Sequence, residues 1–440
     1  MLSDARKIID KALETAMPGN AVKEALKKIE FKPGKLIVVA AGKAAWEMAH
    51  AAAEELGDKI SCGAVVTKYD HSKGDIKNFE IYEAGHPVPD ENSFKATART
   101  LELVNGLSEE DNVLFLLSGG GSALFESPVV SGEEMANITK QLLASGADIV
   151  EMNTIRKRLS NVKGGRFAQA CKPAHVYTVV LSDIIGDPLD MIASGPAYPD
   201  SSTCEEAAEI IERYKIKLSD DAKKLMKQET PKSLDNVDTY VTGSVKQLCK
   251  SAEETAKKLG YEPIFLTACL NCEAREAGRF LGTIAKDHCA KTDAGSTDTK
   301  ALANAAGSGA TANAADSKAT AKAGKSLAYI CGGETVVHLT GKGKGGRNQE
   351  LALAAAEEIS GLEGVCIFSV GSDGTDGPTD AAGGIVDGTT KAKLLEQGIN
   401  IKDVLAENDA YNALKKVDGL IVTGPTGTNV NDLAVVLIKK

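Results

Sequence analysis

The sequence predicts an α/β protein of two domains, the first built on a doubly wound parallel sheet. Three observations lead to this fold class. The chain has 440 residues, which is more than a single hydrophobic core usually serves. Between residues 35 and 200, apolar runs of strand length alternate with helix-forming stretches. Glycine-rich or polar loops follow several of these strands, and open α/β sheets bind ligands at that end of their strands.

Composition narrows the classes of partner. Aromatic residues make up 4% of the chain and the formal net charge is −10, which argues against a nucleic-acid-binding groove. Asp4, Arg6 and Lys7 interrupt any apolar signal-peptide core, and no apolar run reaches transmembrane length. Nine scattered cysteines without framework spacing are typical of reduced thiols. We therefore expect a cytoplasmic protein that binds neither nucleic acid nor membrane.

The first elements are two helices and a buried strand. Residues 2–30 predict two helices, the first capped by Ser3, with a break at residues 18–20. Residues 35–41 form a continuous apolar run that suits a buried parallel strand. Lys43 follows at once, between this strand and the next helix, where a cation can hold an anionic substrate group. The alternative is an ordinary solvated lysine.

A second glycine loop follows the strand predicted at residues 112–117. Residues 118–122 read Ser-Gly-Gly-Gly-Ser, and three consecutive glycines between hydroxyls can form an anion-binding nest. Between the two glycine loops, residues 63–67 predict another strand, and His86 lies in a loop with two prolines. A histidine in such a loop is more often packed or solvated than bound to substrate.

Next comes a dense basic segment, residues 152–166, which includes Arg156. It is either a solvated helix face or a cationic wall for phosphates. The strand predicted at 176–181 then ends beside Asp183 and Asp187. Carboxylates at a strand tip suit Mg²⁺ coordination or base catalysis on a hydroxyl.

The domain boundary is expected after a charged helical stretch at 205–235. We place the first domain at residues 1–236 and the second at 237–440, with the strand at 237–243 beginning a second alternating series. Residues 290–326 are rich in Ala, Gly, Thr, Ser, Asp and Lys and nearly lack large apolar side chains. Such a segment cannot build a core, so we expect a flexible surface insertion.

The second domain contains the richest glycine loop. Residues 335–340 are rich in β-branched residues and predict a strand, whereas 351–359 consist of helix formers. The loop at 341–346 between them, with Arg347, has the character of an anion-binding junction. Its glycines also satisfy G-x-G-x-x-G, a weak dinucleotide fingerprint, but no acidic residue follows at the spacing that a Rossmann site needs.

Two later strands, predicted at 365–370 and 420–423, also deliver polar loops. The first loop carries Asp373 and Asp376, which are candidate metal ligands or bases. The second carries Asn429 and Asp432. Carboxylates in such turns can equally well cap helices or accept backbone hydrogen bonds.

Taken together, these motifs resemble those of the MOFRL-type glycerate 2-kinases over almost the whole chain. The resemblance is carried by Gly42-Lys43, Gly85–Asp90, Ser118–Ser122, Asn153–Ser160, Ser182–Asp187, Ser194-Gly-Pro, Gly332–Thr335, Gly343–Glu350, Ser372–Gly383 and Gly424–Asp432. It implies a Rossmann-like N-terminal domain, a MOFRL C-terminal domain and an active site in the cleft between them. The implied reaction is the ATP-dependent phosphorylation of D-glycerate at its 2-hydroxyl, with Mg²⁺ or another divalent cation.

The resemblance also implies that Lys43 and Arg347 are the essential side chains. The remaining assignments come from the loops described above, and among them Asp183 is a candidate catalytic base or metal ligand. Substrate or phosphate binding is assigned to Ser118, Gly119, Gly120, Gly121, Ser122, Arg156 and Asp187. Nucleotide binding is assigned to Lys342, Gly343, Lys344, Gly345, Gly346, Asn348, Glu350 and Asn429. Metal binding is assigned to Asp183, Asp373 and Asp376.

Two other functions stay open at this point. Similar enzymes have been labelled hydroxypyruvate reductase, which would make the protein an NAD(P)-dependent oxidoreductase. A lysine directly behind a strand and glycine also occurs in phosphosugar-binding modules, so a non-catalytic sugar-phosphate-binding regulator is the second alternative. The sequence does not decide the oligomeric state, and a homo-oligomer stays open.

Overall fold

The computed structural model describes residues 1–182, 189–305 and 325–440, with the side chains of 291–305 left undescribed. The chain forms two compact units. One consists of residues 16–244 and 427–430, and the other of residues 1–15, 245–426 and 431–440. We call them the N-terminal unit and the C-terminal unit.

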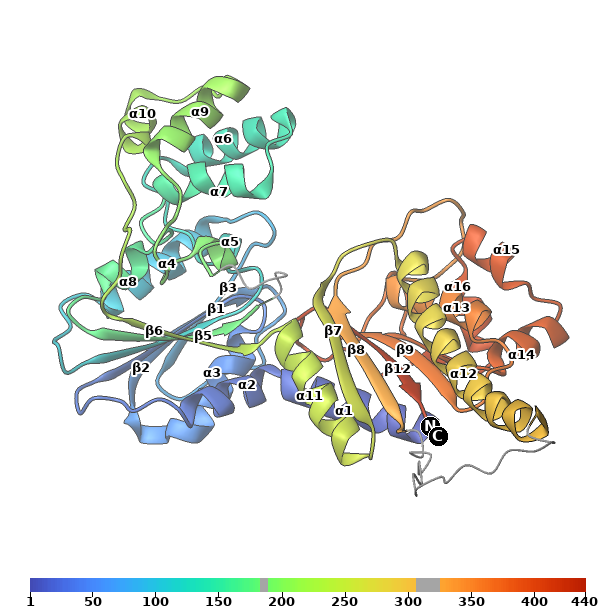
Figure 1. The fold of residues 1–440 in the computed structure, drawn as a ribbon. Helices are drawn as coiled ribbons and strands as arrows, with labels where there is room; N and C mark the ends of the chain where they lie inside the picture. The colour runs from blue at the N-terminus through green and yellow to red at the C-terminus, as the bar shows by residue number, and fades with distance from the viewer. Residues whose placement is uncertain (183–188, 306–324) are drawn as a thin grey trace. The chain divides into compact units, whose positions relative to one another are not determined.

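The N-terminal unit contains a six-stranded, all-parallel sheet in the order β3-β2-β1-β4-β5-β6 (Figure 1). This is the order of a doubly wound dinucleotide-type fold, so the predicted fold class is confirmed. The topology reverses between β1 and β4, which creates a crevice at their carboxyl ends. The strands are β1 (Leu36–Ala41), β2 (Ile60–Lys68), β3 (Phe79–Ala84), β4 (Asn112–Leu117), β5 (His175–Leu181) and β6 (Val237–Gly243).

Helices cover both faces of this sheet (Figure 1). On one face lie α2 (Pro18–Leu26) and α3 (Ala45–Leu56), with the short η1 (Gly57–Lys59) after α3; on the other lie α4 (Glu91–Leu103), α5 (Gly121–Leu124), α8 (Arg166–Ala170) and η2 (Ile192–Ser194). The central strands are buried because both of their faces are covered. Phe115 of β4 packs against Phe125 and Phe167, whose rings also contact each other edge to face.

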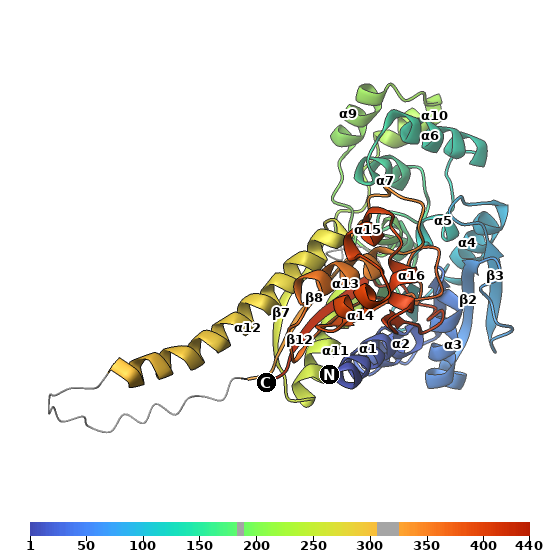
Figure 2. The ribbon, with the colours of Figure 1, turned by 90° about the vertical axis from the view of Figure 1, so that its right-hand side faces the viewer.

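Four further helices form a small group of their own within this unit (Figures 1 and 2). They are α6 (Gly132–Ser145), α7 (Ile149–Arg158), α9 (Cys204–Tyr214) and α10 (Asp220–Met226). They share an apolar cluster that includes Ile138, Ile155 and Ile210. Capping boxes begin α7 at Asp148 and α9 at Thr203, which fixes where these helices start.

The C-terminal unit contains a mixed sheet in the order β11-β10-β9-β12-β8-β7. Only β7 and β8 pair in parallel; the other neighbours are antiparallel. The strands are β7 (Glu262–Leu270), β8 (Leu327–Gly333), β9 (Val365–Gly371), β10 (Gly383–Asp387), β11 (Leu420–Ile421) and β12 (Asp432–Ile438).

Helices again lie on both faces of the sheet. On one side are α1 (Leu2–Ala16) and α11 (Val245–Lys258); on the other are α12 (Ala274–Ala305), α13 (Arg347–Glu358), α14 (Thr390–Glu396), α15 (Ile401–Ala406) and α16 (Ala410–Lys415) (Figure 1). Helix α12 packs along α13 (Figure 2). Nowhere in residues 1–182, 189–305 and 325–440 is there a helix long and apolar enough to cross a membrane.

Several expectations need correction. The strand at 237–243 does not open the second domain, because as β6 it pairs with β5 of the first sheet. The first break in the N-terminal helices comes at Met17, and Pro18 stands at the first turn of α2, where its missing N–H costs nothing. The backbone of residues 290–305 continues α12, whereas the rest of the expected insertion, 306–324, lies outside the described residues.

Residues 335–340 are not a strand, although their composition favours one; only Val336 makes an isolated bridge, to Glu273. The reason is that other partners take their backbone groups. The N–H of Thr340 donates to the side-chain oxygen of Asn408 at 2.7 Å, and its hydroxyl donates to the carbonyl of Ala406 at 2.7 Å. These partners lie far along the chain, so local composition could not reveal them.

Candidate active site

Lys43 and the Ser118–Ser122 loop meet at the crevice of the N-terminal unit. Lys43 follows β1 and the loop follows β4, the two strands between which the topology reverses. The Lys43 N–H donates to the carbonyl of Gly119 at 2.9 Å, and the Ala44 N–H donates to Ser118 Oγ at 3.1 Å. The sequence predicted each loop separately, and the parallel pairing of β1 with β4 brings them together.

The close approach of the two loops requires glycine. Gly42 has a φ of +123°, and a Cβ there would lie 2.3 Å from Ser118 Oγ. Gly120 has a φ of +86°, and a Cβ there would lie 3.1 Å from both the His86 ring and Lys43 Cγ. The side chains of His86 and Lys43 therefore both lie against Gly120. Lys43 itself is exposed, so its ammonium is accessible to a ligand.

His86 also belongs to this cluster, although its place in the sequence favours a packed or solvated role over contact with substrate. Burial lowers the pKa of His86, and the positive charges of Lys43, Lys68 and His71 lower it further. An imidazole that stays neutral near pH 7 can donate or accept a single hydrogen bond without repelling Lys43. The signal available in the sequence was its position in the Gly85–Asp90 motif.

At the far end of the loop, Ser122 is held by a chain of polar groups. Ser122 Oγ lies 2.6 Å from Ser194 Oγ, and Ser194 Oγ donates to Asn153 Oδ1 at 2.9 Å. Ala193 and Ser194 adopt left-handed backbone conformations, with φ of 50° and 61°. Non-glycine residues in this region carry strain, which is commonest at functional sites.

The basic segment is neither a solvated face nor an open cationic wall. Lys157, Arg158 and Lys163 are almost completely buried. Lys157 pairs with Asp200 at 2.9 Å, Arg158 contacts Glu229 at 3.4 Å, and Lys163 pairs with Glu126 at 3.3 Å. The carboxylates that neutralise the segment lie elsewhere in the sequence, which is why the segment alone suggested free positive charge.

Arg156 is the member of this segment that was assigned to phosphate. Its guanidinium is slightly exposed and donates to the carbonyl of Ser122 at 3.2 Å, with Glu126 at 3.8 Å. Lys163 Nζ donates to the same carbonyl at 2.8 Å. Burial lowers the pKa of Lys163 to about 8, and Glu126 acts in the opposite direction. Two cations thus fix one end of the glycine loop, and phosphate binding by Arg156 stays a prediction.

Replacing Lys157 by methionine is expected to destabilise the protein by about 3 kcal/mol, because it leaves the buried Asp200 carboxylate without its cation. Urea unfolding monitored by circular dichroism measures this. The double variant K157M/D200N removes both charges and should recover most of the loss. A single variant as stable as the wild type would show that Asp200 does not depend on Lys157.

In the C-terminal unit, Arg347 opens α13 and contacts two carboxylates. Its Nε donates to one oxygen of Asp432 at 2.6 Å and its Nη2 to the other at 3.0 Å, while Nη1 lies 3.2 Å from Glu334. Burial lowers the pKa of Arg347, but Asp432 and Glu334 outweigh it and raise the pKa overall. Burial raises the pKa of Asp432, opposed by its hydrogen bonds from Arg347. The guanidinium has five N–H donors, so some stay available to a ligand.

The loop at 341–346 does not present all of its amides to solvent. The Gly341 N–H donates to Asn408 Oδ1, the Gly343 N–H to the Glu407 carbonyl, and the Lys344 N–H to Asp409 Oδ1. A Cβ on Gly341 or Gly343 would lie within 2.5 Å of the backbone or side chains at 407 and 409.

These glycines are therefore explained by their packing against residues 407–409. Lys342 and Lys344 remain exposed, and Lys344 Nζ lies 4.4 Å from the centre of the Tyr411 ring. Nucleotide binding by Lys342, Gly343, Lys344, Gly345 and Gly346 stays a prediction, in which the two lysines have the clearest access to a ligand.

The N-terminus of α13 is occupied by the carboxylate of Asp376. Its two oxygens accept from the N–H groups of Asn348 at 3.2 Å and Gln349 at 2.9 Å. Asp376 is 3% exposed, and burial raises its pKa to about 6 despite these hydrogen bonds. Asp376 therefore caps α13, which is one of the two roles that the sequence predicted for it. Because both of its oxygens already accept backbone hydrogen bonds, it is poorly placed to bind a metal.

This burial predicts a pH effect on stability. The pKa of Asp376 is higher in the folded chain than in the unfolded chain, where it is near 3.8. The folded state therefore holds the proton more tightly, and the contribution of this group to stability falls as pH rises from about 4 to about 6. Asp376→Asn removes the titration, so the wild type should lose up to about 3 kcal/mol relative to this variant across that window.

Urea unfolding of both proteins at pH 4.5, 5.5 and 7 measures the difference. Glu396→Gln, an exposed position on α14, serves as the matched control and should show no such trend. A wild type that instead gains stability over the variant as pH rises would contradict the buried, raised-pKa state of Asp376.

The remaining candidates have varied surroundings. Asn348 is buried and accepts a hydrogen bond from Ser369, and Glu350 is buried between Arg275 and Asn408. Asn429 is exposed, whereas Asp373 is half-buried and accepts the N–H of Thr375. Asp183 and Asp187 lie outside the described residues. Across residues 1–182, 189–305 and 325–440, no three His, Cys, Asp or Glu side chains gather in a way that could hold a metal ion.

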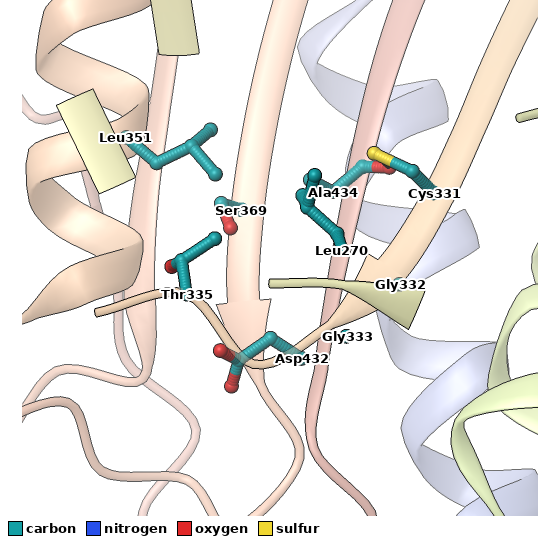
Figure 3. Close-up of a pocket in the computed structure, with 9 residues that line it drawn as sticks. All are labelled: Leu270, Cys331, Gly332, Gly333, Thr335, Leu351, Ser369, Asp432 and Ala434. Carbon is teal, nitrogen blue, oxygen red and sulfur yellow. Dashed lines mark hydrogen bonds between the residues drawn. The ribbon is translucent and has the colours of Figure 1, made fainter. Parts of the chain in front are cut away.

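A small cavity is lined in part by Asp432, the partner of Arg347 (Figure 3). Its volume is about 10 Å³, enough for roughly one water molecule but not for a substrate. The polar side chains in its wall are those of Asp432, Thr335 and Ser369, which Figure 3 shows around the end of β9 and the start of β12. This cavity belongs to the support of Asp432 and is not a binding site.

Comparison with known proteins decides the family. Residues 4–227 match the family described as a domain of unknown function, DUF4147, and residues 327–432 match the MOFRL family. A D-glycerate 2-kinase of Thermotoga maritima is 53% identical over 99% of this chain and 97% of its own. This chain belongs to the MOFRL-type glycerate 2-kinase family. The resemblance inferred from the motifs is confirmed.

Two further comparisons agree with this assignment. A crystal structure of glycerate kinase from Thermotoga maritima, 52% identical, superposes with a TM-score of 0.88 and covers 99% of each chain. A putative hydroxypyruvate reductase of Agrobacterium vitis is 38% identical over 98% of this chain and 93% of its own. The fold and family therefore extend over the whole chain, whereas the reductase label comes from a less similar relative.

Proposed function

We propose that the protein transfers the γ-phosphoryl group of ATP to the 2-hydroxyl of D-glycerate and releases ADP. The observation that carries this is the 53% identity to a D-glycerate 2-kinase over nearly the full length of both chains. In the reaction the bond between the γ-phosphorus and the ADP oxygen breaks, a bond from that phosphorus to the 2-oxygen forms, and the hydroxyl proton is lost.

The N-terminal unit supplies groups suited to this chemistry. Phosphoryl transfer depends mostly on positioning and on neutralising charge on the transferring oxygens. Lys43 is an exposed cation at the sheet's switch point, beside backbone N–H groups of a triple-glycine loop. We assign to Lys43 and the backbone N–H groups of the Ser118–Ser122 loop the binding of an anionic group, either the glycerate carboxylate or a phosphate.

The C-terminal unit supplies Arg347, which we assign to phosphate or to the glycerate carboxylate. Asp432 fixes its guanidinium through two parallel hydrogen bonds. An arginine held in this way keeps its orientation before the ligand arrives, which lowers the entropic cost of binding. Glu334, at 3.2 Å from Nη1, steadies the other side of the fork.

A divalent cation such as Mg²⁺ fits the carboxylates at the strand ends. Mg²⁺ commonly uses one or two carboxylates together with substrate phosphates and water, so a cage of protein ligands is not required. Asp373 is a better candidate for such a carboxylate ligand than Asp376, because Asp373 is more exposed and does not cap a helix. When bound, the cation would neutralise charge on the phosphate oxygens. Asp183 stays a candidate for base or metal binding, and Asp187 for substrate binding.

The glycine loop at 341–346 does not support the reductase alternative. A dinucleotide fingerprint requires a strand before the glycine loop, and residues 335–340 are not a strand. In addition, the glycine amides of 341 and 343 are bonded to residues 407–408. We also expect the protein to be cytoplasmic and to bind a small-molecule substrate, but neither nucleic acid nor membrane. Homo-oligomerisation stays open.

The test is ADP release from ATP, Mg²⁺ and D-glycerate by the purified protein. We expect ADP in proportion to glycerate consumed. Nicotinamide absorbance with hydroxypyruvate, measured in parallel, should show no change. Hydroxypyruvate-dependent oxidation of NADH or NADPH without ADP release would support the reductase instead. Tight binding of a phosphorylated ligand without turnover of ATP would support the sugar-phosphate-binding regulator.

A further inference from the structure

The chain of hydroxyls that ends at Ser122 has a defined direction. Ser194 and Asn153 are buried, with exposed fractions of 0% and 3%, whereas Ser122 is partly exposed and follows Gly120, which lies against Lys43, by two positions. Asn153 Oδ1 can only accept, so Ser194 must give it its hydroxyl proton. The second amide atom, Asn153 Nδ2, faces Met191 Sδ at 4.0 Å, a contact that suits a donor.

This direction fixes what Ser122 can offer to a ligand. Because the Ser194 proton goes to Asn153, the proton in the 2.6 Å contact between the two serines must come from Ser122. Ser122 Oγ is then left with lone pairs alone. It can accept a hydrogen bond from a ligand hydroxyl, but it cannot donate one to a phosphate or carboxylate oxygen.

Ser122 is also held in place more firmly than a loop serine usually is. Arg156 and Lys163 both donate to its carbonyl, at 3.2 and 2.8 Å. The preceding residue, Gly121, lies so close to Ala193 that a Cβ there would approach the Ala193 Cβ to 2.8 Å. The acceptor is therefore preorganised, which is what selective recognition of one hydroxyl requires.

We propose that Ser122 Oγ, oriented by Ser194 and Asn153, accepts a hydrogen bond from the 3-hydroxyl of D-glycerate and so selects for a substrate that carries this group. The proposal rests on the function proposed above. Ser122 contacts the substrate; Ser194 and Asn153 are positioning residues.

The non-reacting hydroxyl is favoured over the reacting one for a chemical reason. The 2-hydroxyl must lose its proton during transfer, and a group that holds it should be able to take that proton onward. The chain from Ser122 ends in an amide oxygen, which is a very weak base. It can orient a hydroxyl that keeps its proton, and in D-glycerate that is the 3-hydroxyl.

The experiment compares D-glycerate with D-lactate, which has a hydrogen in place of the 3-hydroxyl. In the wild type, kcat/KM should be at least about tenfold lower for D-lactate, because the Ser122 acceptor is left unmatched. Ser122→Ala should lower kcat/KM for D-glycerate about tenfold or more and leave D-lactate within about threefold, so that the preference collapses. If D-lactate does not turn over, its inhibition constant against D-glycerate gives the same comparison.

Two further variants test the direction of the chain. Ser122→Thr keeps the hydroxyl and should retain the preference. Ser194→Ala frees the Ser122 hydroxyl to rotate, so the preference should weaken without being abolished. A general loss of folding would lower kcat/KM equally for D-glycerate and D-lactate, and the ratio of the two values would stay unchanged.

Other outcomes would overturn the inference. Equal losses for both substrates in a folded Ser122→Ala variant would mean that Ser122 acts on the carboxylate, the phosphate or the 2-hydroxyl. If Ser122→Ala lowered kcat/KM for neither substrate, Ser122 would not contact the substrate. Absence of D-glycerate turnover in the wild type would count against the proposed function itself, which separates the two failures.

Discussion

Replacement of Lys43 by methionine is expected to lower kcat/KM for D-glycerate phosphorylation by about 10³-fold or more. The side chain is exposed at the switch point of the parallel sheet, beside the triple-glycine loop, and methionine keeps its length while removing its charge. Loss of one donor or cation that stabilises developing charge costs about 10²- to 10³-fold, and loss of a cation that contacts the transferred phosphoryl group costs up to about 10⁵-fold. Steady-state ADP release measures the effect.

The backbone contacts of residue 43 do not depend on its side chain, because its N–H donates to the Gly119 carbonyl and its own carbonyl lies 3.3 Å from Thr67 Oγ1 and 3.1 Å from His71 Nδ1. Lys43→Met should therefore unfold at the same urea concentration as the wild type. Lys59→Met, an exposed lysine at the end of η1, is the matched control and should keep full activity. If Lys43→Met kept wild-type activity, Lys43 would be an ordinary solvated lysine with no part in catalysis.

Replacement of Arg347 by alanine is expected to have two separable effects. Activity should fall by about 10³-fold or more, because the fixed guanidinium is the cation we assign to phosphate or carboxylate in the C-terminal unit. Stability should fall by about 3 kcal/mol, because the buried Asp432 carboxylate loses the partner that holds it at 2.6 and 3.0 Å. Kinetics and urea unfolding measure the two effects on one preparation.

The double variant R347A/D432N separates catalysis from folding. Asparagine removes the buried charge, so the double variant should recover most of the stability. Its activity should remain as low as that of the single variant, because the guanidinium is still missing. Recovery of activity together with stability would mean that Arg347 is structural and contacts no ligand.

The fold was predictable where the information is local. A buried strand, a glycine and a lysine in direct succession place Lys43 at a strand tip, and the apolar run before Ser118 does the same for the triple-glycine loop. The rule that ligands bind where a parallel sheet reverses its order then predicts that the two meet, as the pairing of β1 with β4 shows.

The sequence was less informative where distant residues decide. Gly341 and Gly343 predict a phosphate loop, and this stays a prediction; the sequence did not show that their N–H groups bond to residues 407 and 408 and that a side chain at either position would clash with residues 407–409. Asp432 is separated from Arg347 by 85 positions, so no local pattern could connect them. In the same way, the buried cations of the basic segment are neutralised by Glu126, Asp200 and Glu229, none of which lies within it.

The measurement that tests the central claim most directly is the identity of the phosphorylated product. The protein is given ATP, Mg²⁺ and D-glycerate, and the product is then offered to enolase. Enolase accepts only the 2-phosphate, so the enolase preparation must be free of phosphoglycerate mutase. We predict ADP release with an enolase signal that rises in step with it. ADP release without an enolase signal would place the phosphate on the 3-hydroxyl and contradict the account, as would the absence of ADP release with glycerate.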